Sequence, residues 1–197
     1  MSALFLFFFI CSYLPCQLKA VNLKDSNIEY DCMVVVQDEM LPSNLKEYVE
    51  SAKKFDKAFS TDVSCFKCDG QATIYSPLDF DDYSDVRDYH KAGKKAIERA
   101  LKGGFTAPLL VLPSSPKFKN GELLTLLGAL DALYVPIQYR EDVPSKAQRL
   151  SVLRVAIQEN EMLDSLIKAA VMIESGLYVS RDIGGEFKLF QSIQKPY

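Results

Sequence analysis

Histidine is almost absent from this sequence of 197 residues, and that scarcity limits the chemistry it can perform. His90 is the only histidine, and catalysis by a Ser-His-Asp or Cys-His arrangement needs partners that the sequence does not identify. Neither GxGxxG nor GxxxxGK occurs, and the pairs Gly103-Gly104 and Gly184-Gly185 are too short for a phosphate loop. We therefore expect an ordinary helix histidine, two glycine pairs that end helices, and no catalytic, cofactor-binding or metal-binding residue in the chain.

Cysteine is also scarce. Cys11 and Cys16 lie in an apolar N-terminal stretch, and the odd number that remains, Cys32, Cys65 and Cys68, does not make a disulfide framework. Structural zinc needs four ligands, and no second pair accompanies Cys65 and Cys68. A redox pair favours a helix that starts at the cysteines, whereas Asp69-Gly70 and a strand follow here. We expect two loop thiols and an intracellular body of the protein.

An excess of positive charge is missing as well. The formal net charge is −3, so no overall field attracts nucleic acid. One predicted helix does carry a basic face, formed by Lys91, Lys94, Lys95, Arg99 and Lys102. We expect it to be solvated, and contact with a polyanion is the alternative.

An acidic stretch precedes that helix, at Asp79, Asp81, Asp82 and Asp85. A calcium loop of the EF-hand type that begins at Asp79 requires Gly six positions into the loop and Glu at its twelfth position. The sequence has Ser84 and His90 at those places. We therefore expect acids that stabilise the start of a helix.

The one long apolar run lies at the N-terminus and extends from residue 3 to about Leu14. Its length suits a secretory signal better than a membrane span, but no Lys or Arg precedes it. Residues 1–20 are therefore either a signal peptide or an aberrant N-terminus on a cytosolic protein. Localisation stays open between the secretory pathway and the cytoplasm.

The rest of the chain alternates short apolar runs with amphipathic segments. The central run, residues 106–113, has no polar alternation and ends at Pro113, which is typical of a strand buried on both faces. Further strands are predicted at 31–37, 72–76, 150–157 and, at an edge, 137–140. Helices are predicted at 45–59, 86–102, 122–133 and 160–179. This order predicts an α/β fold: a mixed, mostly parallel sheet with helices on both faces and a long C-terminal helix.

Three motifs resemble a known family. They are Pro108-Leu-Leu-Val-Leu-Pro113, the stretch 126–136 (LLGALDALYVP) and the stretch 174–185 (ESGLYVSRDIGG). Their order and spacing resemble the leucyl (cytosol) aminopeptidase family, and more narrowly the N-terminal half of its aminopeptidase-like branch in animals. The resemblance covers roughly residues 30–185.

That resemblance implies a domain plan. Residues 30–158 would be a non-catalytic α/β domain similar to a macro domain, and residues 159–185 would be a helix leading to a catalytic domain. Residues 186–197 form a divergent tail. The family binds two divalent metals, commonly zinc, in its C-terminal domain around an Asn-Thr-Asp-Ala-Glu-Gly-Arg motif, which these 197 residues lack. No catalytic or metal-binding residue of the family can therefore be placed on this chain.

Three roles follow as hypotheses. The first is a truncated aminopeptidase-type protein that keeps the assembly domain, has no metal cofactor of its own and is inactive as a peptidase. The second is a stand-alone macro-like module that binds a nucleotide or ADP-ribose. The third is a regulatory subunit of a full-length aminopeptidase. We expect self-association or a full-length homologue as partner, without nucleic acid and without a stable membrane span.

Overall fold

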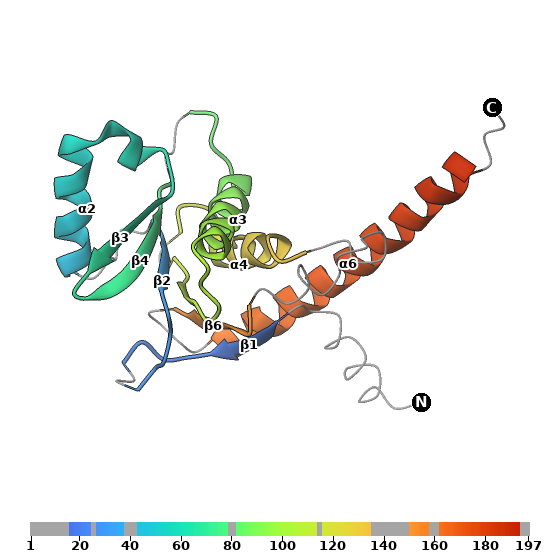
Figure 1. Ribbon diagram of the computed structural model, residues 1–197, viewed down its shortest axis with the longest axis horizontal. Coiled ribbons are helices and arrows are strands. Elements are labelled where there is room, and N and C mark those ends of the chain that lie inside the picture. Colours follow the sequence, from blue (N-terminus) through green and yellow to red (C-terminus); the bar gives the residue numbers. More distant parts are fainter. Residues whose placement is uncertain are drawn as a thin grey trace.

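The computed structural model describes residues 16–24, 27–37, 43–78, 82–113, 116–134, 150–157 and 162–193, with the backbone alone at 43–44 and 185–193. Its centre is a six-stranded sheet (Figure 1). The strands are β1 (Gln17–Ala20), β2 (Met33–Val36), β3 (Ser64–Cys68), β4 (Gln71–Ser76), β5 (Leu109–Val111) and β6 (Val152–Ala156). Their order across the sheet is β1-β6-β5-β2-β4-β3. Every neighbouring pair is parallel except the antiparallel pair of β3 and β4, which confirms the predicted sheet.

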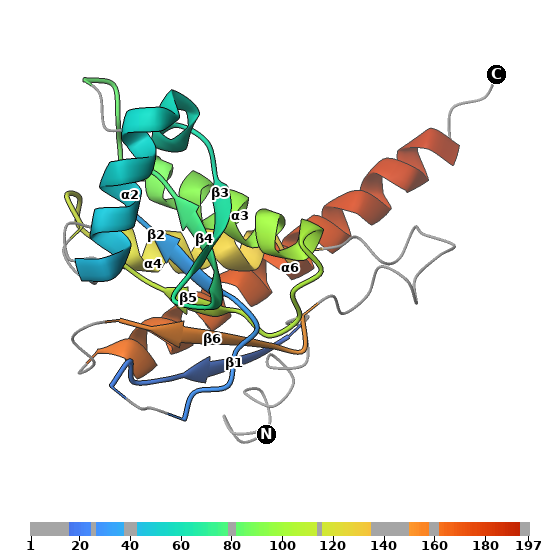
Figure 2. The same ribbon diagram turned by 60° about the vertical axis from the view of Figure 1, so that its left-hand side comes forward.

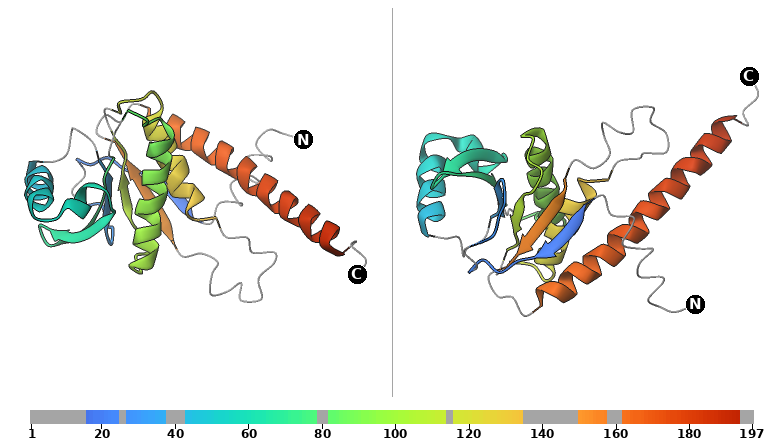
Figure 3. Two further views of the ribbon diagram at one scale, coloured as in Figure 1. Left: turned by 90° about the horizontal axis from the view of Figure 1, so that it is seen from above. Right: turned by 60° about the horizontal axis from the view of Figure 1, so that its bottom comes forward.

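Helices cover both faces of the sheet, as predicted. They are α2 (Ser43–Phe55), the short 3-10 helix η1 (Lys57–Ser60), α3 (Arg87–Lys102), α4 (Gly121–Asp131) and α6 (Leu163–Ile193). Because successive residues of a strand point to opposite faces, Val34 and Val36 of β2 join the core formed with α3, α4 and α6. Val35 between them joins a second core formed with α2 and η1. Figures 2 and 3 show α2 on one side of β2 and β4, with α3 and α4 on the other.

The central strand is shorter than the apolar run that predicted it. β5 spans only Leu109–Val111. The residues before it are fixed by a side chain, because the Asp31 carboxylate accepts hydrogen bonds from the backbone N–H groups of Thr106 and Ala107, the latter at 2.8 Å. The first residues of the run therefore form a loop that Asp31 fixes in place, and the strand begins only at Leu109.

The prediction that Cys65 and Cys68 are loop thiols was wrong. Both lie in strand β3, which pairs with β4 in antiparallel orientation. Asp69 and Gly70 connect the two strands. These two residues have φ values of 48° and 85°, as a tight hairpin of the Asp-Gly type requires. The same dipeptide that argued against a redox helix is thus the turn of a β-hairpin.

One glycine pair ends a helix and the other does not. Gly103 caps α3 and Gly104 has a φ of 79°, so this stop is confirmed. Helix α6 instead continues through Gly184 and Gly185 to Ile193, and the predicted stop there was wrong. Gly costs a helix only about 1 kcal/mol, and the residues after this pair, including Glu186, Lys188 and Leu189, favour helix.

The N-terminal stretch contributes a strand to the sheet. β1 falls within residues 1–20, where Gln17–Ala20 pair in parallel with residues 152–155 of β6. The edge strand predicted at 137–140 lies outside the described residues. Among the helices that the structure describes, none combines the length and apolar character needed to cross a bilayer.

Helices α3 and α4 approach each other through two glycines. A Cβ atom on Gly93 would overlap the backbone carbonyl of Thr125, and one on Gly128 would overlap that of His90. The absence of a side chain at both positions therefore lets the two helix backbones meet, and the helix layer on this face depends on that contact.

We predict that Gly128→Ala lowers the free energy of unfolding by about 3 kcal/mol, since the added methyl group forces the helices apart. The matched control is Gly176→Ala in α6, where nothing lies within 4 Å of the added atom. That change should raise stability by about 0.5–1 kcal/mol. Urea unfolding measures both, and a Gly128→Ala protein as stable as the parent contradicts the close approach.

Candidate functional site

The main cluster of charged side chains joins helices α3, α4 and α6 around Asp131. The Asp131 side chain is 9% exposed, and its Oδ2 lies 2.7 Å from Nζ of Lys94 in α3. Its Oδ1 accepts a hydrogen bond from Nη1 of Arg181 in α6. Asp131 is the last residue of α4, where a negative charge opposes the helix dipole. The two cations offset this repulsion and tie three helices together.

Aromatic and polar contacts extend the cluster along α6. The Tyr178 hydroxyl donates to the backbone carbonyl of Leu130. Its ring lies 4.9 Å from that of Tyr134, over which the Arg181 guanidinium also sits at 5.2 Å. The Tyr134 hydroxyl donates to Asp182 Oδ1 at 2.8 Å. These contacts fix the direction in which α6 leaves the domain.

Two carboxyl groups in the cluster have opposite pKa shifts. Burial tends to raise the pKa of Asp131, but hydrogen bonds and charges from Lys94 and Arg181 outweigh it and lower the pKa. Glu174 is 1% exposed, and its Oε2 has no hydrogen-bond partner. Burial, with a smaller contribution from the Asp131 charge, raises the pKa of Glu174 to about 7.

This arrangement fixes helices in place and does not form a metal centre. Asp131 already uses both carboxylate oxygens on cations, and Glu174 favours its neutral form at and below neutral pH. No group of three His, Cys, Asp or Glu side chains within the described ranges is placed to hold a metal ion. The donor set of these residues therefore does not fit the pair of metals that the family resemblance implies.

The CxxC cysteines do not form a joint site. Residues three apart in a strand point to opposite faces, and Cys65 is exposed whereas Cys68 packs against the core under α2. Burial raises the pKa of Cys68, and it raises the pKa of both Cys16 and Cys32 to about 12. These three thiols stay protonated and unreactive at neutral pH.

His90 lies in α3 as an ordinary helix residue. It is partly buried, and burial lowers the pKa of its imidazole. Its backbone carbonyl forms part of the contact with Gly128, which is a structural role.

One of the acids before α3, Asp85, supports the helix start together with Asp88 of the helix itself. The Asp85 carboxylate accepts from the backbone N–H of Arg87 at 2.7 Å, and Asp88 accepts from that of Asp85 at 2.9 Å. Hydrogen bonds from Arg87 and Lys91, respectively, lower the pKa of Asp85 and Asp88. Asp79 and Asp81 lie outside the described residues.

The basic face of α3 is partly used inside the protein. Lys94 binds Asp131, and Lys91 lies 2.8 Å from Asp88. Lys95 and Lys102 are exposed, and Arg99 is partly buried. Two of the five cations are thus already paired.

The sequence analysis did not identify the Asp131 cluster as a site. A signal was available, because Asp131 lies in the motif 126–136 while Glu174, Tyr178 and Arg181 lie in the motif 174–185. The two stretches that carry the family resemblance therefore meet in space at the junction of α4 and α6. The loops after β2 and β5, where a nucleotide would bind at the carboxyl ends of parallel strands, include residues 38–42 and 114–115. These lie outside the described residues, so the nucleotide hypothesis stays a prediction.

We predict that Glu174→Gln stabilises the protein at neutral pH. The pKa of Glu174 is raised from 4.5 to about 7 in the folded state, so folding retains a proton that the unfolded chain releases between these values. Stability is therefore lost as pH rises from about 4.5 to 7, by up to about 3 kcal/mol at 1.36 kcal/mol per pKa unit.

Urea unfolding at intervals from pH 4.5 to 7.5 tests this loss. The difference between Glu174→Gln and the parent should grow with pH and level off above 7. Glu50→Gln, at an exposed position of α2, is the control and should show no such trend. A difference that does not change with pH contradicts the raised pKa.

Comparisons with known proteins give a consistent result. No family model matches the sequence. A Caenorhabditis elegans protein named "Putative aminopeptidase W07G4.4" is 36% identical over 104 residues, which is 52% of this chain and 20% of the relative. This chain thus spans one fifth of that relative's length.

Two solved structures share the fold. A mutant of tomato leucine aminopeptidase aligns with a TM-score of 0.58 and 14% identity over 79% of this chain and 35% of its own. Leucyl aminopeptidase from Leishmania major in complex with actinonin aligns with a TM-score of 0.52 and 12% identity, over 83% and 34%. Sequence and fold together confirm the resemblance that the motifs indicated, to an N-terminal domain of the leucyl aminopeptidase type.

Proposed function

We propose that this chain acts as the non-catalytic assembly and scaffold domain of a leucyl aminopeptidase-like metallopeptidase. The observation that carries the proposal is the unequal coverage of the structural match. Four fifths of this chain aligns with only about one third of two leucine aminopeptidases. This coverage supports a role as an N-terminal domain of that type, and these 197 residues do not contain the Asn-Thr-Asp-Ala-Glu-Gly-Arg motif.

The chemistry of the described residues supports the same role. Two-metal hydrolysis needs several carboxylates fixed around ions about 3.5–4 Å apart. The buried carboxylate of Asp131 is bound by Lys94 and Arg181, and Glu174 beside it is protonated over much of the pH range below 7. Neither is available as a metal ligand without breaking the junction of α3, α4 and α6.

Helix α6 offers the surface that an assembly domain would use. Its buried side holds Leu163, Ala170 and Tyr178 against the core. Its other sides expose the large apolar residues Met172, Ile173, Leu177 and Ile183, and Met162 is exposed directly before the helix. Figure 1 shows the C-terminal part of α6 extending beyond the sheet. Exposed apolar surface of this kind promotes association, with a second copy or a full-length homologue as partner.

We predict that the purified chain does not hydrolyse leucine p-nitroanilide, with or without added zinc or manganese. The physical reason is that the residues described in the structure include no group of three His, Cys, Asp or Glu side chains placed to hold a metal ion. Release of p-nitroaniline measures activity, and a leucine aminopeptidase assayed in parallel is the positive control. Hydrolysis that a chelator abolishes would overturn the proposal.

We also predict concentration-dependent self-association through α6. Met172→Lys and Leu177→Lys should each raise the dissociation constant at least tenfold, since burial of such a side chain contributes about 1.5–3 kcal/mol. Ser165→Lys, at an exposed polar position of α6, is the matched control and should have little effect. Multi-angle light scattering measures the state, and a monodisperse monomer at every concentration excludes this surface.

A further inference from the structure

A pocket of about 580 Å³ lies on the face of the sheet that α2 leaves open, beside strands β1 and β6. Lys19 and Arg154 of these two strands line it on one side, and Lys24, Asn27, Ile28 and Glu29 line it on another. The polar residues that line it are Lys19, Lys24, Asn27, Glu29 and Arg154, with two aliphatic side chains among them. The volume is typical of a site for a small molecule.

Strand pairing places two cations next to each other in this pocket. Lys19 of β1 is the register partner of Arg154 of β6. Their neighbours Leu18 and Leu153 point the other way, into the core with α3, α4 and α6. Like charges on facing residues of paired strands repel each other, and an anion bound between them would relieve that repulsion.

The guanidinium of Arg154 has hydrogen-bonding capacity to spare. Its Nη1 is buried and has no hydrogen-bond partner, which is costly unless a ligand or solvent satisfies it. Within the part of the chain that the structure describes, no ion pair joins Arg154 or Lys19 to Glu29. A bound carboxylate could accept two parallel hydrogen bonds from Arg154, in the bidentate geometry that guanidinium groups favour.

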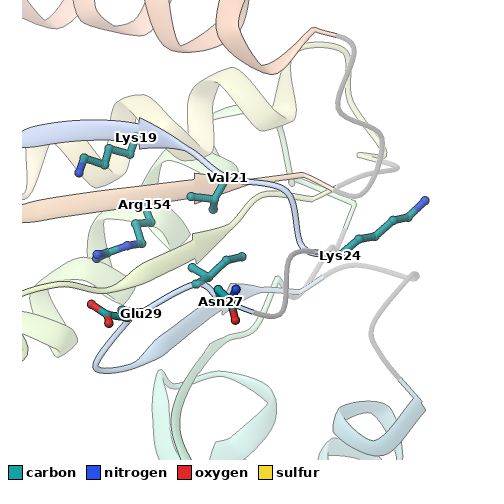
Figure 4. A pocket seen from close by; sticks show the side chains of 7 residues that line it. Lys19, Val21, Lys24, Asn27, Glu29 and Arg154 are labelled. Atoms are coloured by element: carbon teal, nitrogen blue, oxygen red, sulfur yellow. The ribbon is translucent and has the colours of Figure 1, made fainter.

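The charge of the pocket selects the kind of anion. In Figure 4 the ends of Lys19, Arg154 and Glu29 lie toward the same side of the pocket, whereas Lys24 extends away from them. Lys19 and Arg154 can together hold one carboxylate, and the Glu29 carboxylate beside them disfavours a phosphate dianion. Glu29 in turn can bind a positively charged amino group.

We propose that this pocket binds a small zwitterion, a neutral α-amino acid. Lys19 and Arg154 hold its carboxylate, and Glu29 holds its ammonium group. Val21 and Ile28, which also line the pocket, leave apolar surface for its side chain. This site is independent of the proposed scaffold role, because it uses neither α6 nor the junction at Asp131.

Ligand titrations followed by NMR chemical shifts of the full chain, at pH 7 and low salt, test the proposal. Leucine should saturate the site. N-acetylleucine, which lacks the ammonium group, and leucinamide, which lacks the carboxylate, should each bind at least tenfold more weakly. Inorganic phosphate that binds as tightly as leucine overturns the proposal, as does the absence of saturation by leucine at about 50 mM, well above ordinary millimolar affinities.

Variants assign the roles within the pocket. Arg154→Met and Lys19→Met should each weaken leucine binding about tenfold, as expected for loss of a charged hydrogen bond. Glu29→Gln should weaken the binding of leucine but not that of N-acetylleucine. Lys24→Met is the matched control and should change affinity less than twofold.

Thermal unfolding of each variant shows whether it remains folded, and Lys19 on the exposed edge strand gives a second variant if Arg154→Met does not fold. Equal losses from Lys24→Met and Lys19→Met would overturn the assignment, because they would indicate a diffuse attraction without a defined site.

Discussion

The carboxylate of Asp131 holds together the three helices on which the shape of this protein depends. It sits at the end of α4, where its own helix repels it, and it is neutralised by Lys94 from α3 and Arg181 from α6. A buried charge that loses one of its partners is strongly destabilising. The direction of α6, and hence the apolar surface that it presents, is therefore set by an electrostatic contact between segments about fifty residues apart.

Close packing supports that contact from the other side. Gly93 and Gly128 let the backbones of α3 and α4 come into contact. Lys94 follows Gly93 by one residue and Asp131 follows Gly128 by three, so this close approach brings their side chains within reach of each other. Glu174 of α6 is buried beside them, and burial, with a smaller contribution from the Asp131 charge, raises its pKa. The stability of this junction therefore depends on the protonation of Glu174.

The sheet is covered differently at its two ends: a hydrophobic core covers β2 and β4, and a pocket lies over β1 and β6. Over β2 and β4, aliphatic residues from α2 and the aromatic residues Phe59 of η1 and Phe66 of β3 complete a second core, with Phe59 stacked on Tyr75 at 5.5 Å. Over β1 and β6 the residues between β1 and β2 line a pocket that contains paired cations.

Local sequence determined the elements whose signals are short-range. The apolar runs at β2, β4 and β6, the stripe of α3 and its stop at Gly103-Gly104 were all predicted, because burial on both faces and helical periodicity leave their marks within a dozen residues. The Asp-Gly dipeptide of the β3–β4 hairpin is also a short-range signal, but the cysteines before it were interpreted as loop residues. The continuation of α6 past Gly184-Gly185 was missed, because two glycines weaken a helix by less than the surrounding helix formers support it.

Only tertiary structure decided which of these elements meet. Nothing local to Asp131, Glu174 or Arg181 shows that they share one junction, since partners far apart in the sequence are brought together by the packing of whole helices. In the same way, Lys19 and Arg154 become neighbours only through the register of two strands more than a hundred residues apart. The sequence by itself determined the layers of this protein, and the packing of those layers created its charged sites.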